Sequence, residues 1–92
     1  MSPARVEVVV YGAPDCHLCD EAKAVLRPAA ARLGFSLREV DISGDEALEA
    51  RYRTDIPVVE IDGFRTFKYR VPEDELERRI AAAQARRSQR AS

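Results

Sequence analysis

The chain has 92 residues, 46% of them hydrophobic and 34% charged, a composition typical of one soluble globular domain and not of a disordered segment. Its 15 basic and 16 acidic residues leave a net charge of −1, which argues against nucleic-acid and membrane-surface partners. Because the first residues lack the apolar core of a secretory signal, and no apolar run approaches the roughly 20 residues that span a bilayer, we expect a cytoplasmic protein.

Two strand-like runs in the first half of the chain flank one helical pattern. Residues 6–11 are β-branched or aromatic and almost continuously apolar, which is typical of a strand covered on both faces. Apolar residues then recur with helical spacing from Leu18 to Leu33, and Gly34 stands where a helix would end. Residues 36–42 form the next predicted strand. This order predicts a right-handed parallel βαβ unit.

A short helix and a hairpin follow. Residues 44–53 are mostly polar and have acidic residues at the start, which favours a helix there. The strand-like runs 58–61 and 64–69 are separated by Asp62 and Gly63. Asp-Gly between two such runs is the strongest short hairpin signal, because glycine tolerates the positive φ of the turn.

A last helix is predicted from Pro72, with acidic residues in its favourable first turn. Residues 86–92 at its end, which include Arg86, Arg87 and Arg90, are expected to fray. The predicted order is therefore β-α-β-α-β-β-α, in a single α/β domain over residues 1–92 whose core spans about residues 5–85.

Cys16 and Cys19 form a Cys-x-x-Cys motif at the junction of the first strand and the first helix. In a reducing cytosol, such a pair beside a βαβ pattern is typical of a redox site. At a helix start, free backbone N–H groups and the helix dipole lower the pKa of a cysteine from about 8.5 into the range of roughly 3.5–7.5. A cysteine one turn further on is close enough to attack a mixed disulfide. We therefore predict Cys16 as the nucleophile and Cys19 as the resolving cysteine, without a cofactor.

Two other interpretations of the pair stay open. A Cys-x-x-Cys motif is also half of a structural zinc site, but zinc needs four ligands and the only histidine, His17, lies inside the motif. A metal or an iron–sulfur cluster shared across a dimer would make the protein a binding module. Inert buried thiols in a non-catalytic adaptor are the other alternative, since free cysteine is often simply core. The loop-to-helix position argues against inert thiols, the shortage of further ligands argues against zinc, and redox exchange is therefore the favoured interpretation.

Two further residues are candidates for roles near the pair. A protonated His17 would stabilise a Cys16 thiolate, but the helix N-terminus opposes that protonation, so His17 is either a tuning residue or an exposed bystander. Tyr11 ends the first strand close to the motif. We favour a core or edge packing role for it and keep Tyr11 as a candidate substrate contact.

The run YGAPDCHLCDEA at residues 11–22 resembles the glutaredoxin-like family whose members carry Cys-His-Leu-Cys followed by an acidic residue. Residues 51–59 are similar to that family's segment before the third strand, and the resemblance covers roughly residues 5–82. It implies a thioredoxin fold with a four-stranded mixed sheet in the order second, first, third, fourth strand. It also implies a cis Pro57 packed against the cysteines, and an Ile56 main chain that bonds an extended substrate.

Activity and partners follow from the motif and the resemblance together. We expect a monomeric dithiol oxidoreductase for cell redox homeostasis, which reduces disulfides of proteins or small molecules. A reductase or a low-molecular-weight thiol would regenerate it. A glutathione site is in doubt, because Ala13 stands where glutathione-using glutaredoxins have Lys or Arg, and residues 69–71 replace their Gly-Gly pair with larger side chains.

Overall fold

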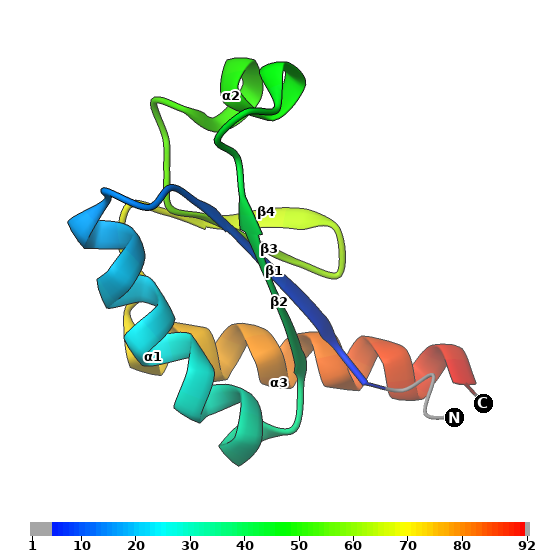
Figure 1. Cartoon of the computed structure of the whole chain (residues 1–92). Coiled ribbons are helices and arrows are strands. Elements are labelled where there is room, and N and C mark those ends of the chain that lie inside the picture. The colour runs from blue at the N-terminus through cyan, green and yellow to red at the C-terminus, as the bar shows by residue number, and fades with distance from the viewer. Residues whose placement is uncertain (1–4, 92) are drawn as a thin grey trace.

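The structure of the chain is a computed structural model that describes residues 5–91, and it has the predicted elements in the predicted order (Figure 1). In chain order these are β1 (Glu7–Gly12), α1 (His17–Leu33), β2 (Ser36–Asp41), α2 (Glu46–Tyr52), β3 (Val58–Ile61), β4 (Phe64–Lys68) and α3 (Glu73–Ala91).

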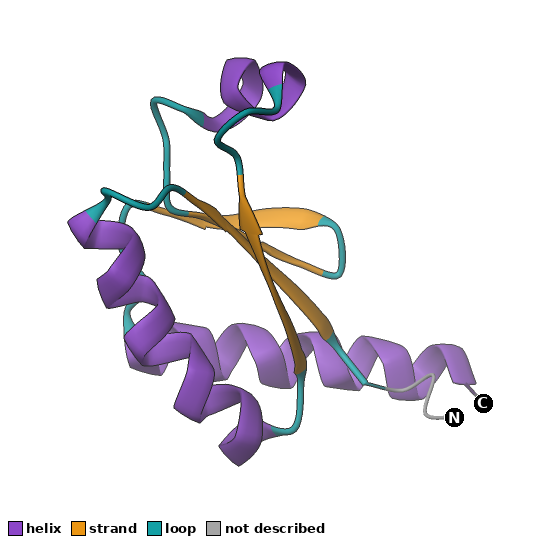
Figure 2. Ribbon diagram, viewed as in Figure 1, coloured by secondary structure: helices purple, strands orange, loops and turns teal. Residues whose placement is uncertain are grey.

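The four strands form one mixed sheet in the order β2-β1-β3-β4, as the resemblance implied. β1 is parallel to β2 and antiparallel to β3, and β4 completes the antiparallel hairpin with β3. Figure 2 shows α1 and α3 on one side of the sheet and α2 on the other. None of the helices within residues 5–91 is long and apolar enough to cross a membrane.

The main core lies between the sheet and the two long helices. On β1 the residues that face these helices alternate with outward ones, and Val8 and Val10 are at most 1% exposed. Each helix contributes a stripe with the same spacing of four and then three residues, which keeps the side chains on one face. These stripes are Ala22, Leu26 and Ala29 on α1, and Leu76, Ile80 and Ala83 on α3.

Local signals set the ends of the elements. Gly34 ends α1 in the left-handed conformation with φ 80°, as its position predicted. Asp62 and Gly63 both have positive φ, at 50° and 86°, as expected for a tight turn between β3 and β4. The last helix begins at Glu73, one residue later than predicted, and the carbonyl of Pro72 accepts a hydrogen bond from the Leu76 N–H at 2.9 Å.

Fraying is the expectation for residues 86–92, whereas α3 continues to Ala91 in the part of that segment that the structure describes. Ser92 lies outside the described residues. The Arg87 guanidinium donates hydrogen bonds of 2.7 and 2.9 Å to the Asp62 carboxylate in the hairpin turn. Asp62 also accepts the Glu7 N–H at 3.0 Å. These contacts fix the last turns of α3 to the sheet, and the Arg87 hydrogen bond lowers the pKa of Asp62.

Candidate redox site

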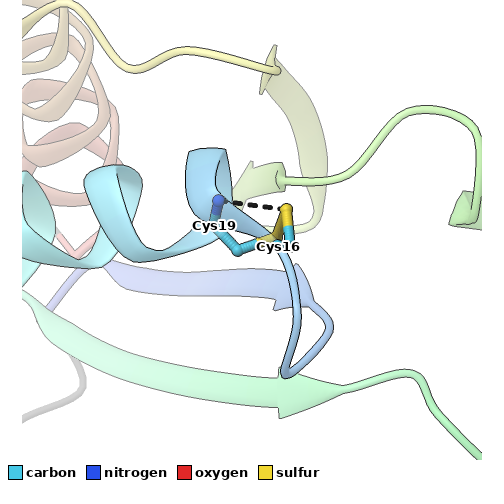
Figure 3. The surroundings of a disulfide bond; sticks show 2 residues. All are labelled: Cys16 and Cys19. Carbon is cyan, nitrogen blue, oxygen red and sulfur yellow. Dashed lines mark hydrogen bonds between the residues drawn. A yellow bond between two sulfur atoms is a disulfide. The ribbon is translucent and has the colours of Figure 1, made fainter.

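The first cysteine caps the first long helix. Cys16 has an extended backbone, with φ −115° and ψ 107°, and its Sγ accepts a hydrogen bond of 3.1 Å from the N–H of Cys19 (Figure 3). The Asp20 N–H closes the first helical turn on the Cys16 carbonyl at 3.1 Å. Sulfur therefore takes the place that a serine or aspartate oxygen usually takes at an N-cap. A negative charge on Cys16 would face a backbone donor and the positive end of the α1 dipole.

The two cysteines differ in their access to solvent. Their Cα atoms are 5.1 Å apart and their sulfurs are joined as a disulfide. Cys16 is half-buried, whereas Cys19 is fully buried beneath the first turn of α1. An external disulfide can therefore approach the pair only from the Cys16 side.

Gly12, the last residue of β1, forms the floor under the pair. A Cβ atom added at Gly12 would lie 3.0 Å from the Sγ and 3.1 Å from the Cβ of Cys19, closer than real Cβ atoms normally approach. The absence of a side chain at Gly12 is thus what allows α1 to begin directly above the sheet. The sequence pattern does not single out Gly12, because its role depends on contact with the helix.

The residues before β3, Ile56 and Pro57, lie beside Gly12. The peptide bond between Ile56 and Pro57 is cis, which confirms the geometry that the resemblance implied. Tyr11 pairs with Val58, so the antiparallel register continues with Pro57 beside Gly12. Pro57 is fully buried. Within residues 5–91, neither the N–H nor the C=O of the half-buried Ile56 has a hydrogen-bond partner.

His17 lies on the outer surface of α1. Its side chain is 86% exposed, and its Nε2 lies 2.9 Å from Oε2 of Glu21, one turn along the helix. The other oxygen of Glu21 lies 3.8 Å from Nη1 of Arg70, in the loop between β4 and α3. A row of exposed charges therefore runs from His17 through Glu21 to Arg70, and the sequence pattern does not single out Glu21 or Arg70. The tuning role of His17 stays a prediction.

Tyr11 points to the other face of the sheet, since it is next to Gly12 in β1. Its ring stacks on Tyr52 of α2, with centroids 4.2 Å apart. Both hydroxyls donate to Glu60, at 2.7 Å from Tyr52 and 3.4 Å from Tyr11. Among residues 5–91, the hydrogen bond and the ring contact of Tyr11 join it to Glu60 and Tyr52, and its role as a substrate contact stays a prediction.

Tyr52 makes the stability of the protein fall as the pH rises through the alkaline range. Burial, reinforced by the hydrogen bond to Glu60, raises the pKa of Tyr52 from 10.0 to about 12. The fold therefore favours the neutral phenol, and this contribution is complete below about pH 10 and lost as the pH rises towards 12. By about pH 11 the loss should reach about 1.4 kcal/mol in the free energy of unfolding.

Denaturant unfolding at about pH 9 and about pH 11 measures this difference. Tyr52→Phe, which has no phenol to ionise, should lose less stability over this interval than the wild-type chain. Equal losses in the two proteins would contradict the assignment to Tyr52.

Among the described residues, no group of three or more His, Cys, Asp and Glu side chains is placed to hold a metal ion. The chemistry that this geometry offers comes from the two sulfurs, the helix start and the free Ile56 main chain.

The comparisons with known proteins agree with this geometry. A family model described as glutaredoxin-like domain (DUF836) matches residues 7–81. A relative described as a glutaredoxin-like protein YDR286C homolog, from Dictyostelium discoideum, is 30% identical over 77 residues, which cover 77% of this chain and 71% of the relative.

Solved structures match the fold. The solution structure of protein Ne2328 from Nitrosomonas europaea has a TM-score of 0.69 and 30% identity, covering 82% of this chain and 91% of the other. The X-ray structure of XcR50 from X. campestris has a TM-score of 0.68 and 32% identity, covering 82% and 96%. Fasciola hepatica thioredoxin, at 21% identity and a TM-score of 0.61 over 87% and 82%, is similar in fold alone.

Proposed function

The chain belongs to the glutaredoxin-like domain family (DUF836), and on this premise we propose that it is a dithiol thiol–disulfide oxidoreductase. The observation that carries the proposal is the position of Cys16, whose sulfur caps α1 and accepts the Cys19 N–H at 3.1 Å. This position stabilises a thiolate, which is the form of cysteine that attacks disulfides.

In the proposed reaction, the Cys16 thiolate attacks one sulfur of a substrate disulfide. A bond forms between Cys16 and that sulfur, and the other substrate sulfur leaves as a thiolate. Cys19 then gives its proton to the substrate thiolate already released and attacks the Cys16 sulfur, which releases the second substrate thiolate. The substrate has gained two electrons, and a Cys16–Cys19 disulfide remains. A reductase or a low-molecular-weight thiol returns two electrons to the pair.

The burial of the pair supports this division of roles. Cys19 is fully buried against Gly12, so an external disulfide meets Cys16 first, and Cys19 reaches only a sulfur already bound to Cys16. The separation of 5.1 Å between the Cα atoms is within the range that a disulfide needs. Access to solvent therefore supports the two proposed roles, in addition to chain order.

The substrate would lie along the segment before β3. The free N–H and C=O of Ile56 can pair with an extended main chain as the edge of a sheet does. Buried Pro57 fixes this edge beside Gly12 and thus beside the pair. We propose a disulfide-containing protein as the main substrate class, with the chain acting as a cytoplasmic monomer.

A disulfide-reduction assay tests the proposal. The protein is mixed with a protein disulfide substrate and a small dithiol that regenerates the Cys16–Cys19 pair. The expected result is reduction faster than with the dithiol alone, in proportion to the amount of protein. A rate equal to that of the dithiol alone would contradict the proposed function.

A further inference from the structure

Tyr69, between β4 and α3, contacts the segment before β3 at both ends. Its N–H donates a hydrogen bond of 2.8 Å to the carbonyl of Pro57. Its hydroxyl lies 3.1 Å from the Thr54 carbonyl and 3.3 Å from Oδ1 of Asp55, both of which can accept its proton. These contacts are made with residues on both sides of Ile56, the residue whose main-chain N–H and C=O have no hydrogen-bond partner within residues 5–91.

The Asp55 carboxylate is also held by a second partner. Asp55 also forms an ion pair with Arg65 of β4, with 3.2 Å between Oδ2 and Nη1. One oxygen of Asp55 therefore faces Arg65 and the other faces the Tyr69 hydroxyl. The Tyr69 hydroxyl thus meets an Asp55 carboxylate that Arg65 already orients, and this favours one position of residues 54–57.

The backbone of Tyr69 adopts an unfavourable conformation. Its φ of 69° lies in the left-handed region, which bulky side chains rarely adopt. Its side chain is not core, because the residue is 42% exposed. The ring also makes a cation–π contact with Lys68, with 5.4 Å from Nζ to the ring centroid. The hydrogen bonds to Thr54, Asp55 and Pro57 join this conformation to the segment before β3, and together these interactions offset the backbone cost.

We propose that Tyr69 is a positioning residue, which holds the Ile56 main chain in the orientation that receives an extended protein substrate. The inference rests on the proposed function and deepens it. Removing the hydroxyl leaves the N–H bond to Pro57 in place but frees the Thr54 end of the segment. The consequence is weaker binding of substrates that need the Ile56 main chain, with the cysteine chemistry unchanged.

Two substrates separate binding from chemistry. Tyr69→Phe should raise KM for a protein disulfide about five- to tenfold, while kcat stays near that of the wild type. This is the effect expected when a hydrogen bond to the Thr54 carbonyl and the Asp55 carboxylate is lost. Its rate with hydroxyethyl disulfide, which has no peptide main chain, should not change. Tyr52→Phe is the matched control, because it also removes a hydroxyl bonded to a carboxylate but lies outside the Thr54–Pro57 segment.

Tyr69→Gly removes the side chain and the unfavourable φ together, so it should fold at least as well as Tyr69→Phe and still show the raised KM. This variant separates positioning from stability. An unchanged KM in both variants, or an equal loss with hydroxyethyl disulfide, would overturn the role of Tyr69 while leaving the proposed function intact. A wild-type protein inactive with both substrates would instead refute the proposed function.

Discussion

Cys16→Ser is expected to lose disulfide reduction on the order of a thousandfold or more, down to the rate of the small dithiol alone. Removing the nucleophile from a site that acts as a unit removes nearly all of its catalysis. Serine keeps an acceptor at the N-cap of α1, so the helix start and the fold should survive. Activity retained by Cys16→Ser would refute the assignment of the nucleophile.

The companion variant distinguishes the two cysteines. Cys19→Ser should still attack a disulfide through Cys16 but should not release the product. A covalent adduct of the protein with half of the substrate then accumulates, and intact-mass measurement detects it. Because Cys19 is fully buried, a serine hydroxyl there can lack a partner, so Cys19→Ala serves as the second test of the same outcome. Rapid turnover without an adduct in both variants would show that Cys19 is not the resolving residue.

The second large effect is expected at Gly12. In Gly12→Val the new Cβ would lie 3.0 Å from the Sγ of Cys19. β1 cannot easily shift, because it is paired with β2 on one side and β3 on the other. The start of α1 must therefore move outward. Such overpacking costs about 1–3 kcal/mol, and each kcal/mol should lower Tm by about 4–8 °C in a domain of this size.

The displacement should also slow the second chemical step more than the first, because Cys19 moves relative to Cys16. Stopped-flow measurement of mixed-disulfide formation and decay separates these two steps. Ala13→Val is the matched control, since it adds β-branched bulk to the neighbouring half-buried residue. A milder Gly12→Ala should lose less stability in a Cys19→Ala background, where the Sγ is absent. Wild-type values of Tm and of the decay rate in Gly12→Val would contradict the contact.

The sequence predicted most of the fold because its signals are local. Apolar periodicity fixed the strands and the long helices, and Gly34 and the Asp62-Gly63 turn fixed their ends. The end of α3 was missed because it depends on the pair between Arg87 and Asp62, which are far apart in sequence. No local pattern reports such a contact, and a run of basic residues alone is typical of a frayed end.

The candidate site was predictable in its chemistry but not in its surroundings. The Cys-x-x-Cys motif at a strand-to-helix junction indicated the cysteine pair without any tertiary information. The support from Gly12 and Tyr69 depends on which elements meet across the fold. Strand alternation alone would have placed Tyr11 and Gly12 on opposite faces of β1, and the stacking of Tyr11 on Tyr52 agrees with that rule.

An equilibrium redox titration of the wild-type chain shows whether Cys16 and Cys19 exchange two electrons as one pair. The protein is equilibrated with graded ratios of reduced and oxidised dithiothreitol, free thiols are alkylated, and intact mass reports how many each molecule carries. If Cys16 and Cys19 act as one dithiol, molecules should carry either two free thiols or none, with a single two-electron transition that Cys16→Ser abolishes. Molecules with one free thiol throughout the titration, or a pair that never closes, would contradict the account.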